Sequence, residues 1–228
     1  MAAKIHENKK LRNLSRIFAD RFDAGEQLAR MLASEYREGK DLFILAIPMG
    51  GVPVALKVRE KLGCPMDLIV VRKIQLPHNT EAGFGAMTQE GEVFINEALL
   101  LNLGLSDKQI ETQKNKVRED LRKRNRRLRD GSPFPDLSDK TVVLVDDGLA
   151  SGYTMLASVH MAKNKNAKKI VVAVPTASPR SIDTLKDSVD EIYCLNIREG
   201  LYFAVAEAYK NWRDLDEREV MSLYKRTP

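Results

Sequence analysis

TVVLVDDGLASGYT, which occupies residues 141–154, combines a strand signal, a pair of acids and a turn of small residues. The β-branched apolar run at 142–145 predicts a strand that is buried on both faces. Asp146 and Asp147 follow at the point where such a strand ends. Small residues at 148–152 then lead into a helix-like run at 153–161. We therefore expect a strand, a turn and a helix, with two carboxylates at the carboxyl end of the strand.

The turn between this strand and this helix has the chemistry of an anion site, because free backbone N–H groups and the helix dipole point into it. Ser151 and Thr154 can add hydroxyl donors. The paired aspartates would repel a phosphate, but they suit sugar hydroxyls or a hydrated Mg²⁺ ion. A phosphorylated sugar fits both halves of the segment. The alternative is an ordinary βα turn with an acidic strand end.

Residues 142–155, VVLVDDGLASGYTM, resemble the phosphoribosyl-pyrophosphate (PRPP) motif of the type I phosphoribosyltransferases. That motif has four apolar residues, two acidic residues and then a loop of small and hydroxyl residues. The resemblance implies that Asp146 and Asp147 are catalytic and hold the ribose hydroxyls, with a Mg²⁺ ion held indirectly through PRPP. It also implies that a loop wraps the 5′-phosphate, formed by Gly148, Leu149, Ala150, Ser151, Gly152, Tyr153 and Thr154.

The resemblance also implies an α/β fold, with a mainly parallel twisted sheet flanked by helices, a small hood and a long basic helical insertion. Strands that alternate with helices along the chain support a parallel sheet. The expected organisation is an N-terminal arm over 1–19, a phosphoribosyltransferase-like domain over 20–215 with the insertion at 106–130 and the hood from about 198, and a C-terminal helix or tail over 216–228.

The composition is that of a globular protein, with 228 residues, 43% hydrophobic and 30% charged. No stretch approaches the roughly 20 apolar residues of a membrane span, and residues 1–10 lack the apolar core of a signal peptide. Cys64 and Cys194 are the only cysteines, so we expect no disulfide framework and a reducing, cytoplasmic setting. The net charge of +5 permits an anionic ligand or nucleic acid.

The N-terminal third predicts a βα unit behind a basic arm. Residues 1–17 are polar and basic, and we expect an arm or a frayed segment there. Asp23 can cap a helix, with Glu26 completing a capping box and Gly39 ending it. A buried strand over 42–47, a helix over 52–62 and a strand over 68–71 are expected to follow.

The turn Pro48-Met49-Gly50-Gly51 is a second candidate site, because paired glycines let the backbone approach a ligand closely. By resemblance it is the pyrophosphate loop, which reads P-R-G-G in the closer relatives. Met49 replaces the arginine here, which removes a charged contact and leaves binding to backbone amides. A tight turn needed only for packing is the alternative.

Arg72 and Lys73 follow the strand predicted at 68–71, where ligands of open α/β sheets gather. They could neutralise the pyrophosphate leaving group, with Lys73 as a catalytic residue; solvated surface is the alternative. Residues 75–92 are predicted to be a loop, with a hairpin over 86–95. The position of this loop resembles that of the flexible loop that closes over PRPP, where His78 and Glu81 are candidate contacts. A lone loop histidine can equally be only exposed.

Residues 106–129 predict one long helix, which Ser106 can cap. We expect a solvated helix with one face packed on the body or on a partner subunit. A nucleic-acid surface is the alternative, limited to phosphate contacts because no interleaved aromatics are present. The helix owes its charge to Lys114, Lys116, Arg118, Arg122, Lys123, Arg124, Arg126, Arg127 and Arg129.

The last third predicts a strand over 168–174, a helix that begins at Ser178-Pro179 and a strand over 192–195. His160 is expected to be structural or exposed. The region 198–224 resembles the hood that covers the nucleobase in the family. Its aromatics could stack on a base, and core packing explains them equally well; the hood candidates are Tyr202, Phe203 and Trp212.

The resemblance implies Mg²⁺-dependent transfer of a phosphoribosyl group from PRPP to a nitrogenous, nucleobase-like acceptor, as in purine or pyrimidine salvage, by a protein that is usually a homodimer. In the hypoxanthine–guanine branch an aspartate serves as the base near the purine, and Ala150 stands at that position. Ala150 therefore weighs against that branch. Tyr153 is bulky where the family has small or polar residues.

Three rival functions remain open. A PRPP-synthesising kinase shares the aspartate motif, but it would need a second, similar domain. A dehydrogenase would need a G-x-G-x-x-G turn after a strand, and the sequence has none. A regulator that senses PRPP or a nucleotide could keep the loop, lose turnover and bind nucleic acid through its basic helix. The regulator is the serious alternative.

Overall fold

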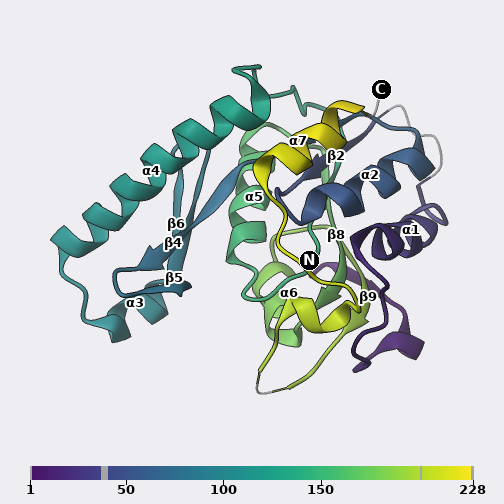
Figure 1. Cartoon of the computed structure of the whole chain (residues 1–228), viewed down its shortest axis with the longest axis horizontal. Coiled ribbons are helices and arrows are strands. Elements are labelled where there is room, and N and C mark those ends of the chain that lie inside the picture. The colour runs from purple at the N-terminus through teal and green to yellow at the C-terminus, as the bar shows by residue number, and fades with distance from the viewer. Residues whose placement is uncertain (1, 37–40, 201, 227–228) are drawn as a thin grey trace.

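The computed structural model describes residues 2–36, 41–200 and 202–226, with the side chains of residues 80, 81 and 226 outside the description. Its centre is a parallel six-stranded sheet with the strand order β1-β9-β8-β7-β2-β3 (Figure 1). The parallel α/β fold predicted from the sequence is therefore confirmed. The strands are β1 (Lys4–Glu7), β2 (Leu42–Ala46), β3 (Met66–Leu68), β7 (Thr141–Val145), β8 (Lys169–Ala177) and β9 (Glu191–Ile197).

Helices cover both faces of this sheet, which explains why its central strands β2, β7 and β8 are mostly apolar. α1 (Arg21–Leu32) and α2 (Gly51–Leu62) pack on one face, and α5 (Tyr153–Asn164) and α6 (Pro179–Leu185) pack on the other. Successive residues of β7 alternate between the two cores. Val143 and Val145 face α1 and α2, whereas Val142 and Leu144 face α5 and α6.

The N-terminal segment is more ordered than its composition indicates. Lys4–Glu7 forms the edge strand β1 beside β9, so the prediction of a frayed arm is wrong for these residues. A short 3-10 helix, η1 (Lys9–Leu11), follows. The prediction that Asp23 caps the first helix is also wrong. Asp20 caps α1 through its side chain, which accepts from the backbone N–H groups of Phe22 and Asp23. Gly39 lies outside the described residues.

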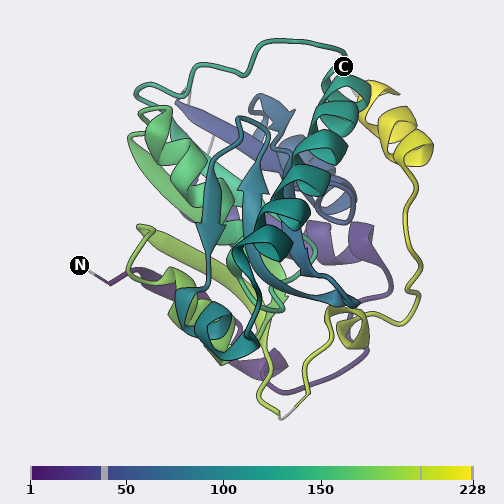
Figure 2. The same ribbon diagram turned by 90° about the vertical axis from the view of Figure 1, so that its left-hand side faces the viewer.

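An antiparallel extension projects from the sheet, at the left of Figure 1, and it faces the viewer in Figure 2. It consists of β4 (Val71–Leu76), β5 (Asn79–Thr88), β6 (Val93–Ile95), α3 (Glu97–Leu103) and α4 (Asp107–Arg129). The hairpin of β5 and β6 was predicted, but the loop predicted over 75–92 is wrong because β5 occupies most of it. Arg72 and Lys73 lie within β4, not at the end of a strand of the main sheet.

The long basic helix is confirmed as α4, with Ser106 and Gln109 forming a capping box. Its apolar stripe is buried through Val117, Leu121 and Leu128. Arg129 anchors its carboxyl end, donating to Asp67 Oδ1 at 2.6 Å and to the Leu68 carbonyl at 2.8 Å. The helix is therefore a structural part of the extension, with one face packed on β4 and β5 as expected.

The chain ends in a 3-10 turn, η2 (Val205–Ala208), and the helix α7 (Glu217–Arg226). Val220 of α7 is fully buried, and the Tyr224 hydroxyl donates to the Met66 carbonyl at 3.3 Å. Glu217 pairs with Arg124 and Arg127 of α4. α7 therefore links the extension to the main sheet. Among the described residues, no helix combines the length and apolarity needed to cross a membrane.

Candidate functional site

Asp146 and Asp147 lie directly after β7, at the carboxyl edge of the sheet, as predicted. Both are half-buried, and the backbone N–H of Asp147 donates to Asp146 Oδ1 at 2.8 Å. Burial raises the pKa of Asp146 well above its usual value, and the charge of Asp147 raises it further. Burial also raises the pKa of Asp147. Two crowded carboxylates cost stability, which indicates a role other than packing.

Arg21 is a member of this site that the sequence did not reveal. Its Nε donates to Asp147 Oδ2 at 2.8 Å, and its charge opposes the rise in the pKa of Asp147. The Tyr209 hydroxyl donates to the Asp147 carbonyl at 2.5 Å. Arg21 and Asp147 are 126 positions apart, so only the fold brings them together. The first turn of α1 therefore fixes one oxygen of Asp147.

The loop after the aspartates is held by β8 and α6. The Leu149 N–H donates to the Thr176 carbonyl at 2.9 Å. Ser181 Oγ donates to the Leu149 carbonyl at 3.0 Å, and Ser178 Oγ donates to the Ala150 carbonyl at 3.3 Å. Ser178 was predicted only as a helix cap, which it is, and its second role was missed. Both serine hydroxyls therefore bond to carbonyl oxygens of the loop, and neither bonds to a backbone N–H group of residues 151–154.

The start of α5 is an open cradle for an anion. Gly152 is the N-cap, with a left-handed φ of +80°, and it has no side chain to cap the helix. In the described part of the chain, no acceptor is bonded to the backbone N–H groups of Ser151, Gly152, Tyr153 and Thr154. Ala150 and Ser151 are exposed. Free N–H groups and an uncapped helix dipole can together bind a phosphate.

The turn Pro48-Met49-Gly50-Gly51 touches the aspartates, and its glycines are needed for that contact. A Cβ at Gly50 would lie 1.8 Å from Asp147 Oδ2, and a Cβ at Gly51 would lie 2.6 Å from the Val145 carbonyl oxygen. The Gly51 N–H is already bonded to the Ile47 carbonyl. The N–H groups of Met49 and Gly50 have no protein acceptor among the described residues, which leaves them to a ligand. The Pro48–Met49 peptide bond is cis.

The remaining predicted residues lie in the extension and the C-terminal region. Arg72 pairs with Asp120 of α4 at 2.8 Å, so a ligand would have to compete for it. The stem of Lys73 lies across Gly83 of β5. His78 is exposed in the turn between β4 and β5. The side chain of Glu81 lies outside the described residues.

The three hood aromatics do not form one surface. Tyr202 is 92% exposed. Phe203 lies under the Arg198 guanidinium at 4.6 Å, whereas Trp212 packs over Arg21 at 3.8 Å. Val205 of the same region packs against Gly148, because a Cβ there would lie 2.6 Å from Val205 Cγ1. Of the predicted hood, the segment around Phe203 is therefore the part beside the loop.

His160 proves structural, since it stacks on Phe94 at 4.7 Å and burial lowers its pKa.

The acidic pair is too small to hold a metal alone. Within the described ranges, no group of three or more His, Cys, Asp or Glu side chains is placed to share a metal ion. Mg²⁺ prefers octahedral oxygen coordination, usually from one or two carboxylates together with waters and substrate phosphates. Asp146 and Asp147 would fit such an ion through a phosphorylated substrate, which together with water would supply most of its ligands.

One family model and two relatives match most of this chain. The model of the phosphoribosyl transferase domain family matches residues 19–209. Relatives from two strains of Mycobacterium tuberculosis, named provisionally as phosphoribosyl transferases, are 35% identical over 211 residues. That match covers 92% of this chain and 47% of the relatives, so the chain spans about half of their length.

Solved structures with a similar fold also match most of this chain. A protein from Thermus thermophilus is 32% identical with a TM-score of 0.74, and the match covers 92% of this chain and 98% of that protein. An Aquifex aeolicus protein, 11% identical with a TM-score of 0.50 over 83% of this chain and 78% of its own, shares the fold alone.

Proposed function

Because the chain belongs to the phosphoribosyl transferase domain family, we propose that it transfers the phosphoribosyl group of PRPP to a nitrogenous, nucleobase-like acceptor and releases pyrophosphate. The observation that carries this proposal is the meeting of three features at one edge of the sheet. They are the Asp146–Asp147 pair, the open cradle at residues 151–154 and the Gly50 turn against Asp147.

Each part of PRPP has a matching part of the site. The free N–H groups of the cradle would bind the 5′-phosphate, with Ser151 and Thr154 adding hydroxyls. The carboxylates of Asp146 and Asp147 would accept hydrogen bonds from the ribose hydroxyls. The Met49 and Gly50 N–H groups would hold the pyrophosphate. A bound Mg²⁺ ion would neutralise charge on the pyrophosphate as it leaves.

The extension and the segment around Phe203 would complete the site. Lys73 of β4 would neutralise the leaving group, and Arg72 would assist after exchanging Asp120 for pyrophosphate. His78, in the turn between β4 and β5, and Glu81, early in β5, would contact PRPP when this turn closes and excludes water. Tyr202 and Phe203 would cover the acceptor. We propose that the transfer itself needs mainly positioning, charge neutralisation and exclusion of water.

Ala150 narrows the acceptor class. It is exposed in the loop, and its methyl group cannot take a proton from a purine. This weighs against a hypoxanthine–guanine type of acceptor. Pyrophosphate release measured with Mg²⁺ and PRPP across nucleobases tests the proposal. Release with one base names the acceptor, whereas retained PRPP binding without release from any base would favour a PRPP-sensing regulator.

The basic surface of α4 is expected to have no part in the reaction. Many of its cations already have acidic partners; the ion pairs are Lys114 with Glu111, Lys123 with Glu119, Arg124 and Arg127 with Glu217, and Arg129 with Asp67. The triple variant Arg122→Glu, Lys123→Glu, Arg126→Glu is therefore expected to release pyrophosphate at the wild-type rate. A collapse of that rate would contradict the view that α4 is only structural. The same conclusion would follow if the wild type bound RNA in a salt-sensitive way and the variant did not.

A further inference from the structure

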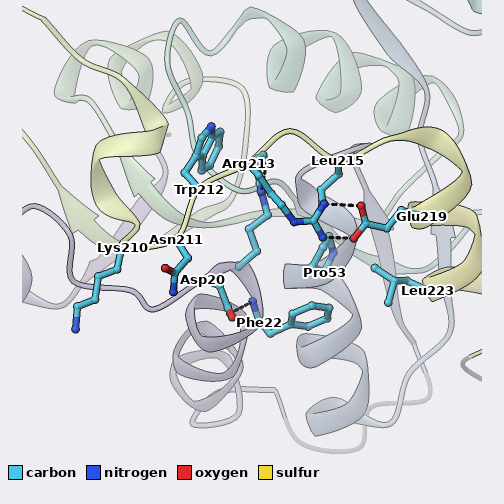
Figure 3. A pocket seen from close by; sticks show the side chains of 11 residues that line it. Asp20, Phe22, Pro53, Lys210, Asn211, Trp212, Arg213, Leu215, Glu219 and Leu223 are labelled. Carbon is cyan, nitrogen blue, oxygen red and sulfur yellow. Dashed lines mark hydrogen bonds and ion pairs between the residues drawn. The ribbon is translucent and has the colours of Figure 1, made fainter.

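A pocket of about 430 Å³ lies outside the proposed PRPP site, between the start of α1, the first turn of α2, residues 210–215 and α7 (Figure 3). Its lining includes Arg21 but neither aspartate and no residue of the loop 148–154. An occupant would therefore touch Arg21 without touching the residues proposed to bind PRPP. The other lining residues are Asp20, Phe22, Pro53, Lys210, Asn211, Trp212, Arg213, Leu215, Glu219 and Leu223.

Arg21 gives this pocket a buried hydrogen-bond donor. Its side chain is 9% exposed. Its Nε donates to Asp147, and its Nη1 donates to the Arg213 carbonyl at 2.8 Å. Across the described residues, Nη2 has no protein acceptor. A guanidinium N–H without a protein acceptor, on a residue that lines a pocket, favours a ligand that carries an anionic oxygen.

The side chains that line this pocket favour a ligand with a flat ring. Trp212 covers Arg21 at 3.8 Å and remains 37% exposed, and Phe22 remains 36% exposed. Figure 3 shows the ion pair of Arg213 and Glu219 on the α7 side, with Trp212, Asn211 and Lys210 on the opposite side. Aromatic and apolar walls with a few placed polar groups are typical of small-molecule sites.

The charges of the residues that line the pocket favour an anionic ligand. Glu219 neutralises Arg213 through a bidentate pair, and the Asp20 carboxylate is used to cap α1. The Lys210 side chain and the Asn211 amide have no protein partner among the residues that the structure describes. They add one cation and one amide to the lining of the pocket, and both kinds of group can donate to an acid group.

We propose that this pocket is a second ligand site, which takes a small planar aromatic anion, and that Arg21 couples its occupation to Asp147. The coupling rests on the proposed function, whereas the binding does not. An anion bonded to Nη2 draws on the same guanidinium that balances the Asp147 charge. PRPP, itself a polyanion, then meets two less compensated carboxylates, so the pocket ligand and PRPP weaken each other by the same factor.

Trp212 reports on the pocket directly, because it is the only tryptophan of the chain. Benzoate, added to the full chain without PRPP, is expected to change its fluorescence saturably. Benzamide has the same ring without the charge, and acetate has the charge without the ring. Each is expected to bind at least about ten-fold more weakly than benzoate, because benzamide loses a charge-assisted hydrogen bond and acetate loses a stacked ring. No saturable change with benzoate, or equal binding of all three probes, overturns the site.

Phe22→Ala tests the location of the probe. The partly exposed ring can be removed with the fold retained, and benzoate binding is expected to fall several-fold. Leu14→Ala, at a residue that is 47% exposed and does not line the pocket, is the matched control and keeps wild-type binding. Unchanged benzoate binding in folded Phe22→Ala would place the probe elsewhere and overturn the assignment.

The coupling is measured by titrating PRPP at zero and at saturating benzoate. PRPP affinity is expected to fall roughly five-fold or more, within the usual range of coupling between sites. Benzoate binding with an unchanged PRPP affinity overturns the coupling. If PRPP fails to bind even without benzoate, the proposed function fails, and the fluorescence result still decides the pocket.

Discussion

Replacing both Asp146 and Asp147 by asparagine is expected to abolish PRPP binding while the chain stays folded. Asparagine keeps the shape but lacks the charge that strengthens a hydrogen bond from a ribose hydroxyl. Two charge-assisted hydrogen bonds of about 1.5–3 kcal/mol each correspond together to a loss of roughly 100-fold or more in affinity. Calorimetric titration of PRPP in the presence of Mg²⁺ measures the loss, and circular dichroism checks the fold.

A matched double variant controls for the removal of two charges. Asp183 and Asp187 are exposed and lie in or just after α6, and Asp183 pairs with Lys186, which is not a residue of the site. The variant Asp183→Asn, Asp187→Asn is expected to bind PRPP as the wild type does. Wild-type affinity in the Asp146→Asn, Asp147→Asn variant would show that the site has been assigned to the wrong residues.

The single variant Asp146→Asn is expected to be more stable than the wild type at neutral pH. The pKa of Asp146 is raised by burial and by Asp147. An acid whose pKa is higher in the folded state gives its full stabilisation below its unfolded pKa and loses it as the pH rises through the folded pKa. Wild-type stability should therefore fall as the pH rises from acid through that raised pKa, and the variant should show a smaller fall, because only the raised pKa of Asp147 remains. A lower Tm of the variant at neutral pH would contradict the account.

Gly50→Ala is the second large effect that we expect. The backbone φ at Gly50 is −64°, which alanine adopts without strain, so only the new contact matters. The added Cβ would lie 1.8 Å from Asp147 Oδ2, and Asp147 must move away from Arg21. Losing one charge-assisted hydrogen bond to the ribose lowers PRPP affinity by about ten-fold or more, and overpacking costs about 1–3 kcal/mol of stability.

Gly63→Ala provides the matched control for this substitution. Gly63 has a φ of +63° and no atom within 4 Å of an added Cβ. Alanine there costs about 1–2 kcal/mol through its left-handed backbone conformation, with PRPP affinity unchanged. Both variants therefore lose stability, and only Gly50→Ala loses affinity. Equal PRPP affinities in the two variants would show that the contact between Gly50 and Asp147 has no functional role.

Features that depend only on residues close together in the sequence could be predicted. The run 142–147 specifies both a buried strand and its terminal acids, and Ser106 and Ser178 cap the helices expected of them. The first part of β5, before the predicted hairpin at 86–95, could not be predicted, because Gly83 and Gly85 make it resemble a loop. A Cβ at Gly85 would lie 2.4 Å from the Phe94 carbonyl oxygen, so this glycine serves close strand packing.

Contacts between distant segments were also beyond prediction. Nothing local to Arg21 indicates that it balances Asp147, and nothing near Trp212 indicates that it covers Arg21. The same holds for β1, whose polar residues 4–7 are ordered by pairing with β9 and not by their own propensity. The acids of the site were therefore visible in the sequence, but the residues that position them were not.

Calorimetric titration of the wild-type chain with PRPP, with and without Mg²⁺, is the most direct test of the account. We expect saturable binding that requires Mg²⁺ and that disappears in the Asp146→Asn, Asp147→Asn variant. Absence of PRPP binding in both conditions, from a chain that circular dichroism shows to be folded, would contradict the proposal that this edge of the sheet is a PRPP site.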